Sequence, residues 1–201
     1  MFQYRERLHG IMESDRWQQA LIRDYLYNNK LTVFFGDSQI ELWAMAESFG
    51  SFPTINKGIS GDYAFKAIDR FEKDVIDLKP KLLVILIGIN DLRVSQNIDT
   101  IVDNIEIMLK KSKNDNINII LCSLLPVRNE HIKNHSLNDI LRINSKLKIL
   151  SQQYETDYAD FHSQLVDKEG QFKRDLTTDG LHPNKSGYLK MSKVLFPYLI
   201  K

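Results

Sequence analysis

The chain contains a single cysteine, Cys122, and this scarcity excludes two kinds of structure. An internal disulfide needs two cysteines, and a metal site built mainly from cysteine needs several. Cys122 ends the apolar run 119–122, which is typical of a buried strand. Reactive cysteines need exposure and an electropositive setting, so we expect Cys122 to be an inert core residue.

The sequence also lacks an excess of charge of one sign and a long apolar segment. Lys and Arg total 27 against 26 Asp and Glu, a formal net charge of +1. A chain so close to neutrality has no overall attraction to nucleic acid or to an anionic membrane. No stretch reaches the roughly 20 apolar residues of a membrane-spanning helix, and residues 1–19 lack the apolar core of a signal peptide. We therefore expect a soluble cytoplasmic protein without nucleic-acid partners or a membrane span.

Three common glycine motifs are absent as well. The sequence has no Gly-x-Ser-x-Gly, which marks the nucleophile turn of the α/β-hydrolase fold. It has no Gly-x-Gly-x-x-Gly and no Walker loop, which hold nucleotide phosphates. These absences argue against that hydrolase fold and against nucleotide binding by those two loops.

What is present is organised around residues 31–42, LTVFFGDSQIEL. An apolar run leads into Gly36, Asp37 and Ser38, and an amphipathic segment follows, which predicts a strand, a tight turn and a helix. Asp and Ser favour helix starts because their side-chain oxygens accept from free backbone N–H groups. Ser38 therefore stands where either a nucleophile or a simple helix cap would be placed, and this stretch alone leaves both open.

The rest of the chain alternates strand and helix patterns, without repeats or linkers. Expected strands are 31–35, 54–56, 81–87, 117–123 and 157–161; expected helices are 38–49, 65–76, 98–109, 137–150 and 188–198. The run 81–87 is almost continuously apolar, as in a central parallel strand. The pattern predicts one three-layer α/β domain over 1–201, with a parallel sheet between helices. Within it, residues 1–30 form an N-terminal helical extension, whose helix begins at 13 or 14 and ends near 27.

Polar and glycine positions follow four of the predicted strands. They are Ser38, the loop from Gly58 to Gly61, Asn90, and the segment 179–182. In an open α/β sheet, ligands bind outside the carboxyl ends of the strands. We therefore expect these four positions to meet on one rim of the sheet.

Acyl transfer is the chemistry that these residues could perform together. The Ser38 hydroxyl would attack a carbonyl once His182 takes its proton, and Asp179 would orient the imidazole. The resulting oxyanion would be bound by the backbone N–H groups of Ser38 and Gly61 and by the Asn90 amide.

Four sequence blocks resemble those of the GDSL-type, or SGNH, hydrolases. The blocks are 35–39 (FGDSQ), 56–62 (NKGISGD), 88–91 (GIND) and 179–183 (DGLHP), in the order of that family and spread over nearly the whole chain. Within the family, the chain looks most like acetylhydrolases typified by the catalytic subunits of platelet-activating-factor acetylhydrolase. Gln39 stands where many members have Leu.

The resemblance implies a role for each matching residue. Ser38 is the implied nucleophile, Asp179 and His182 are its partners, and Gly61 and Asn90 are oxyanion donors beside the Ser38 N–H. It also implies a flavodoxin-like five-stranded sheet of order 2-1-3-4-5, and neither a metal nor an organic cofactor.

Structural roles remain as alternatives for the oxyanion positions. Gly58 could provide the close backbone approach in place of Gly61, and Asn90 could serve only its own turn. We interpret Asp37 and Asp91 as structural carboxylates that tie loops together.

Further candidates concern the histidines. His182 could be a surface loop residue, and Asp175 is the fallback if Asp179 does not orient it. His131 and His135 are four residues apart, a spacing that suits a metal on a helix, but their stretch is typical of a loop and lacks the Glu of zinc proteases. We expect no metal there, and the loop's position suggests that Arg128 or His131 shapes the acyl or alcohol pocket.

The sequence therefore predicts a serine esterase that removes a short acyl group, acetyl in the first instance, through an acyl-serine intermediate. Two alternatives stay open: a thioesterase or lysophospholipase for longer acyl chains, and a binding module for acylated sugar or lipid without turnover. The expected partner is a small ester, and a homodimer stays open.

Overall fold

The computed structural model describes residues 31–50, 52–94, 97–131 and 135–199, so the extension expected over 1–30 lies outside the described residues. The five strands form one parallel sheet in the order β2-β1-β3-β4-β5, which confirms the expected topology. Their bounds are β1 (Thr32–Gly36), β2 (Thr54–Gly58), β3 (Leu82–Leu86), β4 (Asn118–Cys122) and β5 (Asp157–Ala159).

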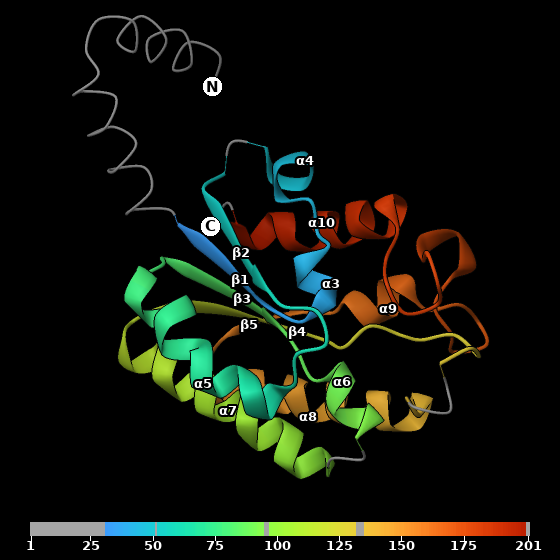
Figure 1. Ribbon diagram of the computed structural model, residues 1–201, viewed down its shortest axis with the longest axis horizontal. Coiled ribbons are helices and arrows are strands. Elements are labelled where there is room, and N and C mark those ends of the chain that lie inside the picture. The colour runs from blue at the N-terminus through green and yellow to red at the C-terminus, as the bar shows by residue number, and fades with distance from the viewer. Residues whose placement is uncertain (1–30, 51, 95–96, 132–134, 200–201) are drawn as a thin grey trace, which may run out of the picture.

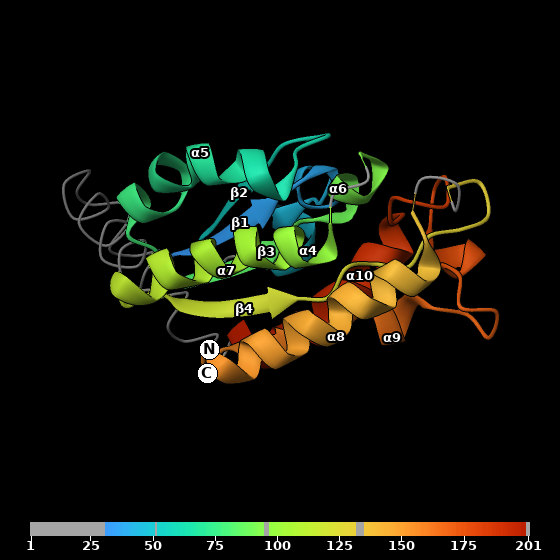
Figure 2. The same ribbon diagram turned by 90° about the horizontal axis from the view of Figure 1, so that it is seen from below.

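Helices cover both faces of the sheet, as the three-layer prediction requires (Figure 1). One face carries α3 (Ser38–Glu41), α4 (Met45–Phe49), α9 (Phe161–Leu165) and α10 (Lys185–Leu199). The other carries α5 (Ala64–Asp74), α7 (Ile98–Asn114) and α8 (Leu137–Gln153). Figure 2 shows α5, α7 and α8 side by side along that face. The short α6 (Ile89–Arg93) follows β3 at the carboxyl edge.

The core forms on both sides of β1 because successive side chains of a strand point to opposite faces. Phe34 packs edge-on against Trp43 with ring centroids 5.6 Å apart, on the face of α3 and α4. Phe35 packs edge-on against Phe71 of α5 at 5.1 Å, on the opposite face. All four rings are buried. The first residues of α3 are thus held against a packed strand.

The single helix expected over 38–49 is wrong, since the chain forms α3, a break at 42–44, and then α4. Asn56 of β2 explains the break, because its side-chain amide donates to the carbonyls of Ile40 and Trp43, at 2.7 and 3.2 Å. In a continuing helix these carbonyls would accept from backbone N–H groups further along the chain. Where the helix ends, they need other partners, and the Asn56 amide is one. The end of β2 also abuts α3 so closely that a Cβ at Gly58 would lie 2.1 Å from the Glu41 nitrogen.

Two other segments differ from expectation. The segment after Gly88, where no helix was expected, forms α6, and the strand expected to extend to Phe161 ends at Ala159, with Phe161 beginning α9. Asp160 causes the second change, because its carboxylate accepts from the Ser163 N–H at 3.0 Å and so caps a helix. Of the short 3₁₀ turns, η1 (Ile76–Leu78) follows α5 and η2 (Arg174–Leu176) precedes the loop that leads to α10.

Candidate active site

Ser38 is the first residue of α3 and lies immediately beyond the end of β1. Asp37 is the N-cap of this helix, since its carboxylate accepts from the Gln39 N–H at 2.9 Å. The Ser38 hydroxyl is therefore not needed as a cap, and its Oγ instead lies 2.9 Å from Nε2 of His182, 144 residues further along the chain. The nucleophile position and the imidazole are within proton-transfer distance.

His182 is held in turn by Asp179. The imidazole Nδ1 lies 2.7 Å from Oδ2 of Asp179, while Oδ1 of the same carboxylate accepts from the N–H groups of Leu181 and His182 at 2.9 and 2.8 Å. Asp175, the fallback partner, lies in η2, and its contact with this region is a backbone carbonyl that accepts from Asn184. The ring therefore contacts Asp179 rather than Asp175.

Hydrogen bonding keeps the Asp179 carboxylate ionised. Its burial alone would raise its pKa, but the hydrogen bonds from the His182 backbone, the His182 ring and the Leu181 backbone outweigh this and lower the pKa to about 2. The ionised Asp179 carboxylate accepts a hydrogen bond from the N–H at Nδ1 of His182. The other ring nitrogen, Nε2, then carries no proton, and its lone pair faces Ser38. This is the tautomer that a general base requires.

The segment that carries Asp179 and His182 is fixed by hydrogen bonds within the loop. The His182 carbonyl accepts from the Thr178 N–H at 2.9 Å and from the Thr177 hydroxyl at 2.7 Å. The Thr177 hydroxyl oxygen also accepts from the Gly180 N–H at 2.9 Å. The imidazole is therefore presented on a tight turn with little freedom.

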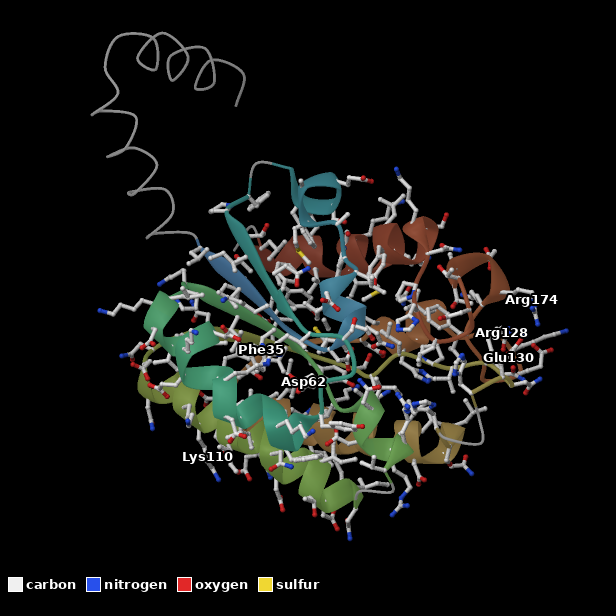
Figure 3. The ribbon with its side chains drawn as sticks, viewed as in Figure 1. Phe35, Asp62, Lys110, Arg128, Glu130 and Arg174 are labelled. Carbon is white, nitrogen blue, oxygen red and sulfur yellow. The ribbon has the colours of Figure 1, made fainter. Side chains whose placement is uncertain are left out.

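The loop after β4 supports this turn from outside, at the end of the molecule where Figure 3 labels Arg128 and Glu130. The Arg128 N–H donates to the Gly180 carbonyl at 2.9 Å, and Nε2 of His131 lies 3.1 Å from the Asp179 carbonyl. Both residues thus contact the Asp179–His182 turn, and the expectation that Arg128 or His131 shapes a substrate pocket stays a prediction.

The predicted oxyanion positions also meet at this edge. Asn90 lies in α6 and is buried, and its side-chain amide donates to the Asp62 carbonyl at 3.0 Å, so it reaches across to the turn that contains Gly61. In that turn the Asp62 N–H donates to the Ile59 carbonyl at 3.1 Å, and Gly61 has φ of +77°. A positive φ at this position is typical of a type II turn and favours glycine.

These contacts separate the roles of the two glycines and of Asn90. Gly58 makes its close approach to the backbone of α3, whereas a Cβ at Gly61 would meet no atom within 4 Å. The glycine at 61 is therefore explained by its backbone conformation, and the glycine at 58 by its close approach to α3. Asn90 joins α6 to the Gly61 turn, since its side-chain amide donates to the Asp62 carbonyl.

A family model described as the GDSL-like lipase/acylhydrolase family matches residues 34–190, which include all of the positions above. The chain belongs to this family. It is therefore a GDSL-type carboxylic-ester hydrolase. No curated protein matches the chain at a significant level.

Solved structures resemble this GDSL-like hydrolase over most of its length. A candidate acylhydrolase from Bacteroides fragilis is 28% identical, with a TM-score of 0.80 over 85% of this chain and 86% of that one. A protein described as a candidate platelet activating factor from Streptococcus pneumonia is 26% identical, with a TM-score of 0.78 over 92% and 100%. An acetylxylan esterase from Geobacillus stearothermophilus is 20% identical, with a TM-score of 0.69 over 85% and 94%, which is a likeness of fold.

Three side chains that the sequence did not single out as site residues hold the hydrolase's loops in place. Gln39 donates from Nε2 to the Leu181 carbonyl at 3.1 Å and so joins α3 to the His182 turn. Glu41 accepts from the N–H of Ser60 at 2.8 Å and from the Ser60 hydroxyl. The sequence signal for Glu41 was its position three residues after Ser38, which places the two residues on the same face of a helix.

Arg70 is the third of these side chains, and it ties the Gly61 turn to the sheet. Its guanidinium donates to the Asp62 carboxylate at 2.8 Å and to the carbonyls of Gly36 and Lys57 at 3.0 and 2.9 Å. The guanidinium also lies 4.1 Å from the centre of the Phe35 ring, and Figure 3 labels Phe35 and Asp62 in this central region. A half-buried arginine with carboxylate, carbonyl and ring contacts is strongly positioned.

Asp37 and Asp91 are the loop-tying carboxylates expected from the sequence. Asp91 accepts from the Ala64 N–H at 2.9 Å and so joins α6 to the start of α5. Burial raises the pKa of Asp37 to about 7, against the lowering effect of the Gln39 hydrogen bond, and nearby Asp91 and Asp62 add to the rise. Burial likewise raises the pKa of Asp91 to about 6.

We expect Asp37→Asn to stabilise the protein at alkaline pH but not at acidic pH. Because the folded-state pKa of Asp37 is raised from 3.8 to about 7, its contribution to stability is complete below pH 3.8 and is lost as the pH rises through 7. Asn resembles the protonated carboxyl and keeps an oxygen for the cap. The Tm gain over wild type should be at least ~4 °C larger at pH 8 than at pH 4 by calorimetry. The exposed Asp77→Asn is the control, and a gain independent of pH would contradict the prediction.

His131 and His135 use their rings for backbone contacts. Nδ1 of His135 lies 3.1 Å from the His131 carbonyl, and His131 contacts Asp179 as described. In the parts of the chain that the structure describes, no three His, Cys, Asp or Glu side chains cluster as a metal site would need.

Cys122 is buried in β4, and burial raises the pKa of its thiol well above the usual value. Across the same described ranges, no helix has both the length and the apolar character to span a membrane.

Proposed function

We propose that this GDSL-like hydrolase is a serine esterase that removes a short acyl group, acetyl in the first instance, from an alcohol. The observation that carries the proposal is the continuous chain of contacts from Ser38 Oγ to His182 Nε2 at 2.9 Å and from His182 Nδ1 to Asp179 at 2.7 Å. A serine hydroxyl becomes a nucleophile when such a base takes its proton.

The reaction proceeds in two halves. In the first, Ser38 Oγ attacks the ester carbonyl carbon while its proton passes to Nε2 of His182, and the carbonyl oxygen becomes an oxyanion. The N–H groups of Ser38 and Gly61 and the Asn90 amide bind this oxyanion. The tetrahedral intermediate then collapses, the C–O bond to the alcohol breaks, and His182 returns the proton to the leaving oxygen.

The second half regenerates the enzyme. Water attacks the acyl-Ser38 carbonyl carbon, and its proton passes to His182. The bond to Ser38 Oγ breaks, Oγ recovers a proton from His182, and the carboxylic acid is released. Asp179 stays ionised throughout and stabilises the imidazolium that forms in each half, in keeping with its pKa of about 2.

The choice of a short acyl group is supported by the sequence resemblance to acetylhydrolases and by the name of one similar structure, an acetylxylan esterase. A chain-length series of p-nitrophenyl esters tests it, because each CH₂ that an acyl slot buries is worth about 0.8 kcal/mol. We expect kcat/KM to be highest for acetate and to fall from butyrate onward. A maximum at octanoate or beyond would favour the thioesterase or lysophospholipase alternative.

A serine-reactive fluorophosphonate separates the enzyme from a binding module on the same fold. We expect one covalent adduct, located by peptide mass spectrometry on Ser38, and its loss when excess substrate ester is present. Ser145 on α8 is the internal control, since its hydroxyl donates to the Leu141 carbonyl of its own helix. Ester binding without any adduct at Ser38 would overturn the proposed covalent step.

A further inference from the structure

A cavity of about 610 Å³ opens beside His182. Leu42, Glu47 of α4, and Lys185 and Leu189 of α10 contribute to its wall, together with both His182 and Asp179. Ser38, Gly61 and Asn90 are not among its lining residues. The cavity therefore adjoins the site on the imidazole side and away from the predicted oxyanion donors.

The fold explains this division. The cavity is built from α4, α10 and the turn before α10, which belong to one face of the sheet. Gly61 and Asn90 come from the turn before α5 and from α6, which Figure 1 shows on the other side of α3. The start of α3, with Ser38, lies between the two.

We propose that this cavity binds the alcohol half of the substrate. This inference rests on the proposed function and identifies the part of the ester that the site selects. In ester cleavage the leaving oxygen takes its proton from His182 Nε2, so the alcohol departs on the imidazole side. The carbonyl oxygen must at the same time face the donors at Gly61 and Asn90. A group that extends past the imidazole is therefore attached to the leaving oxygen, not to the acyl carbon.

The wall indicates the class of alcohol. Leu42 and Leu189 are 56% and 55% exposed, and Pro183 and Tyr188 add ring surfaces. The Tyr188 hydroxyl donates to the Gln39 carbonyl at 3.1 Å and is thus engaged away from a ligand. Exposed apolar side chains that gather in a concave site are typical of ligand binding.

Charge narrows the class further. Besides Asp179 and His182, the cavity wall contains the charged side chains of Glu47 and Lys185. They form an ion pair, with Nζ of Lys185 3.1 Å from Oε2 of Glu47. Both side chains are largely exposed, and their opposite charges leave this wall with no net charge to select a phosphate or an ammonium group. The geometry therefore favours a neutral alcohol with a bulky, ring-containing body, larger than the acyl group that it carries.

Leu42→Trp tests the assignment by filling the cavity. The probes are cyclohexylmethyl acetate and ethyl acetate, which share the acyl group and leave as alkoxides of similar basicity. We expect the ratio of their kcat/KM values, cyclohexylmethyl over ethyl, to fall at least ~10-fold in the variant, in line with the discrimination that pocket shape provides. Leu141→Trp, at a residue of α8 that is 49% exposed, is the matched control and should leave the ratio unchanged.

The acyl half is varied in a second series, with ethyl acetate and ethyl hexanoate. Leu42→Trp should leave the ratio of these two kcat/KM values within twofold of wild type. If that ratio falls while the alcohol ratio does not change, the cavity holds the acyl chain and the inference is wrong.

Binding of free cyclohexylmethanol, followed by ligand-observed NMR, reports on the cavity without turnover. We expect binding to wild type, to Ser38→Ala and to Leu141→Trp, and at least ~10-fold weaker binding to Leu42→Trp. Equal binding to the wild type and Leu42→Trp overturns the cavity assignment, even in an active esterase. Loss of binding in Leu42→Trp in a protein that hydrolyses no ester would instead reject the proposed function and retain the ring-binding cavity.

Discussion

Ser38→Ala is expected to lower kcat for p-nitrophenyl acetate by a factor on the order of 10⁶, the loss seen when a serine protease loses its nucleophile. The Oγ of Ser38 contacts Nε2 of His182, and without it no acyl-enzyme forms. Residual hydrolysis would come from water attack on an ester still bound by the oxyanion donors. Steady-state kinetics with acetate and butyrate esters measure the loss, and the fluorophosphonate adduct should disappear with it.

The same variant should remain folded. Asp37, not Ser38, caps α3, and alanine is a good helix residue, so the start of the helix has no reason to unravel. Circular dichroism and a Tm within a few degrees of wild type would show this. Ser145→Ala makes the same chemical change on α8, at a hydroxyl that donates to the Leu141 carbonyl, and should keep full turnover. A Ser38→Ala protein with at least a tenth of wild-type activity would remove Ser38 from the mechanism.

Asp179→Asn is expected to lower kcat by about 10⁴, the size of the loss when a triad aspartate becomes asparagine in a serine protease. The Asp179 carboxylate accepts from the N–H groups of Leu181 and His182 through Oδ1 and from the His182 ring through Oδ2. Asparagine can keep the backbone contacts with its carbonyl oxygen, but its NH₂ then faces Nδ1. The ring would take the tautomer with the proton on Nε2, which cannot accept a proton from Ser38.

Asp175→Asn is the matched control, because Asp175 is the other nearby aspartate that could have oriented His182. It is exposed in η2, and we expect its replacement to change kcat by less than twofold. A pH profile adds a second readout. Since the pKa of Asp179 is about 2, the wild-type enzyme should show no loss of activity from its protonation above pH 4. A large loss in Asp175→Asn with none in Asp179→Asn would reverse the assignment.

The sequence predicted the sheet and its active edge well because both depend on local patterns. Continuous apolar runs mark buried parallel strands, and the right-handed connection between parallel strands limits their order. Once the strands were placed, the residues after them had to meet at one edge, and Ser38 and His182 do meet there. The split between α3 and α4 was missed because it depends on Asn56 of β2, a residue that only the packing of the sheet brings next to α3.

The supporting contacts could not be found in the same way. Gln39 was noted only as a departure from the Leu of many family members, yet its amide reaches the Leu181 carbonyl. Arg70 lies on an amphipathic helix like many surface arginines, and its contacts with Asp62 and Gly36 depend on how α5 packs on the sheet. The position of the His131 ring at the Asp179 carbonyl likewise depends on how the loop after β4 packs against the turn before α10.

The sequence by itself determined the fold class and the set of reactive groups, because strand and helix periodicity and the residue after each strand are local properties of the chain. Only the tertiary structure decided which carboxylate faces His182, which residue caps α3, and on which side of the imidazole a cavity opens. Hydrogen bonds select partners by distances of a few tenths of an ångström. Such distances between residues 144 positions apart are set by the packing of the whole sheet and its helices.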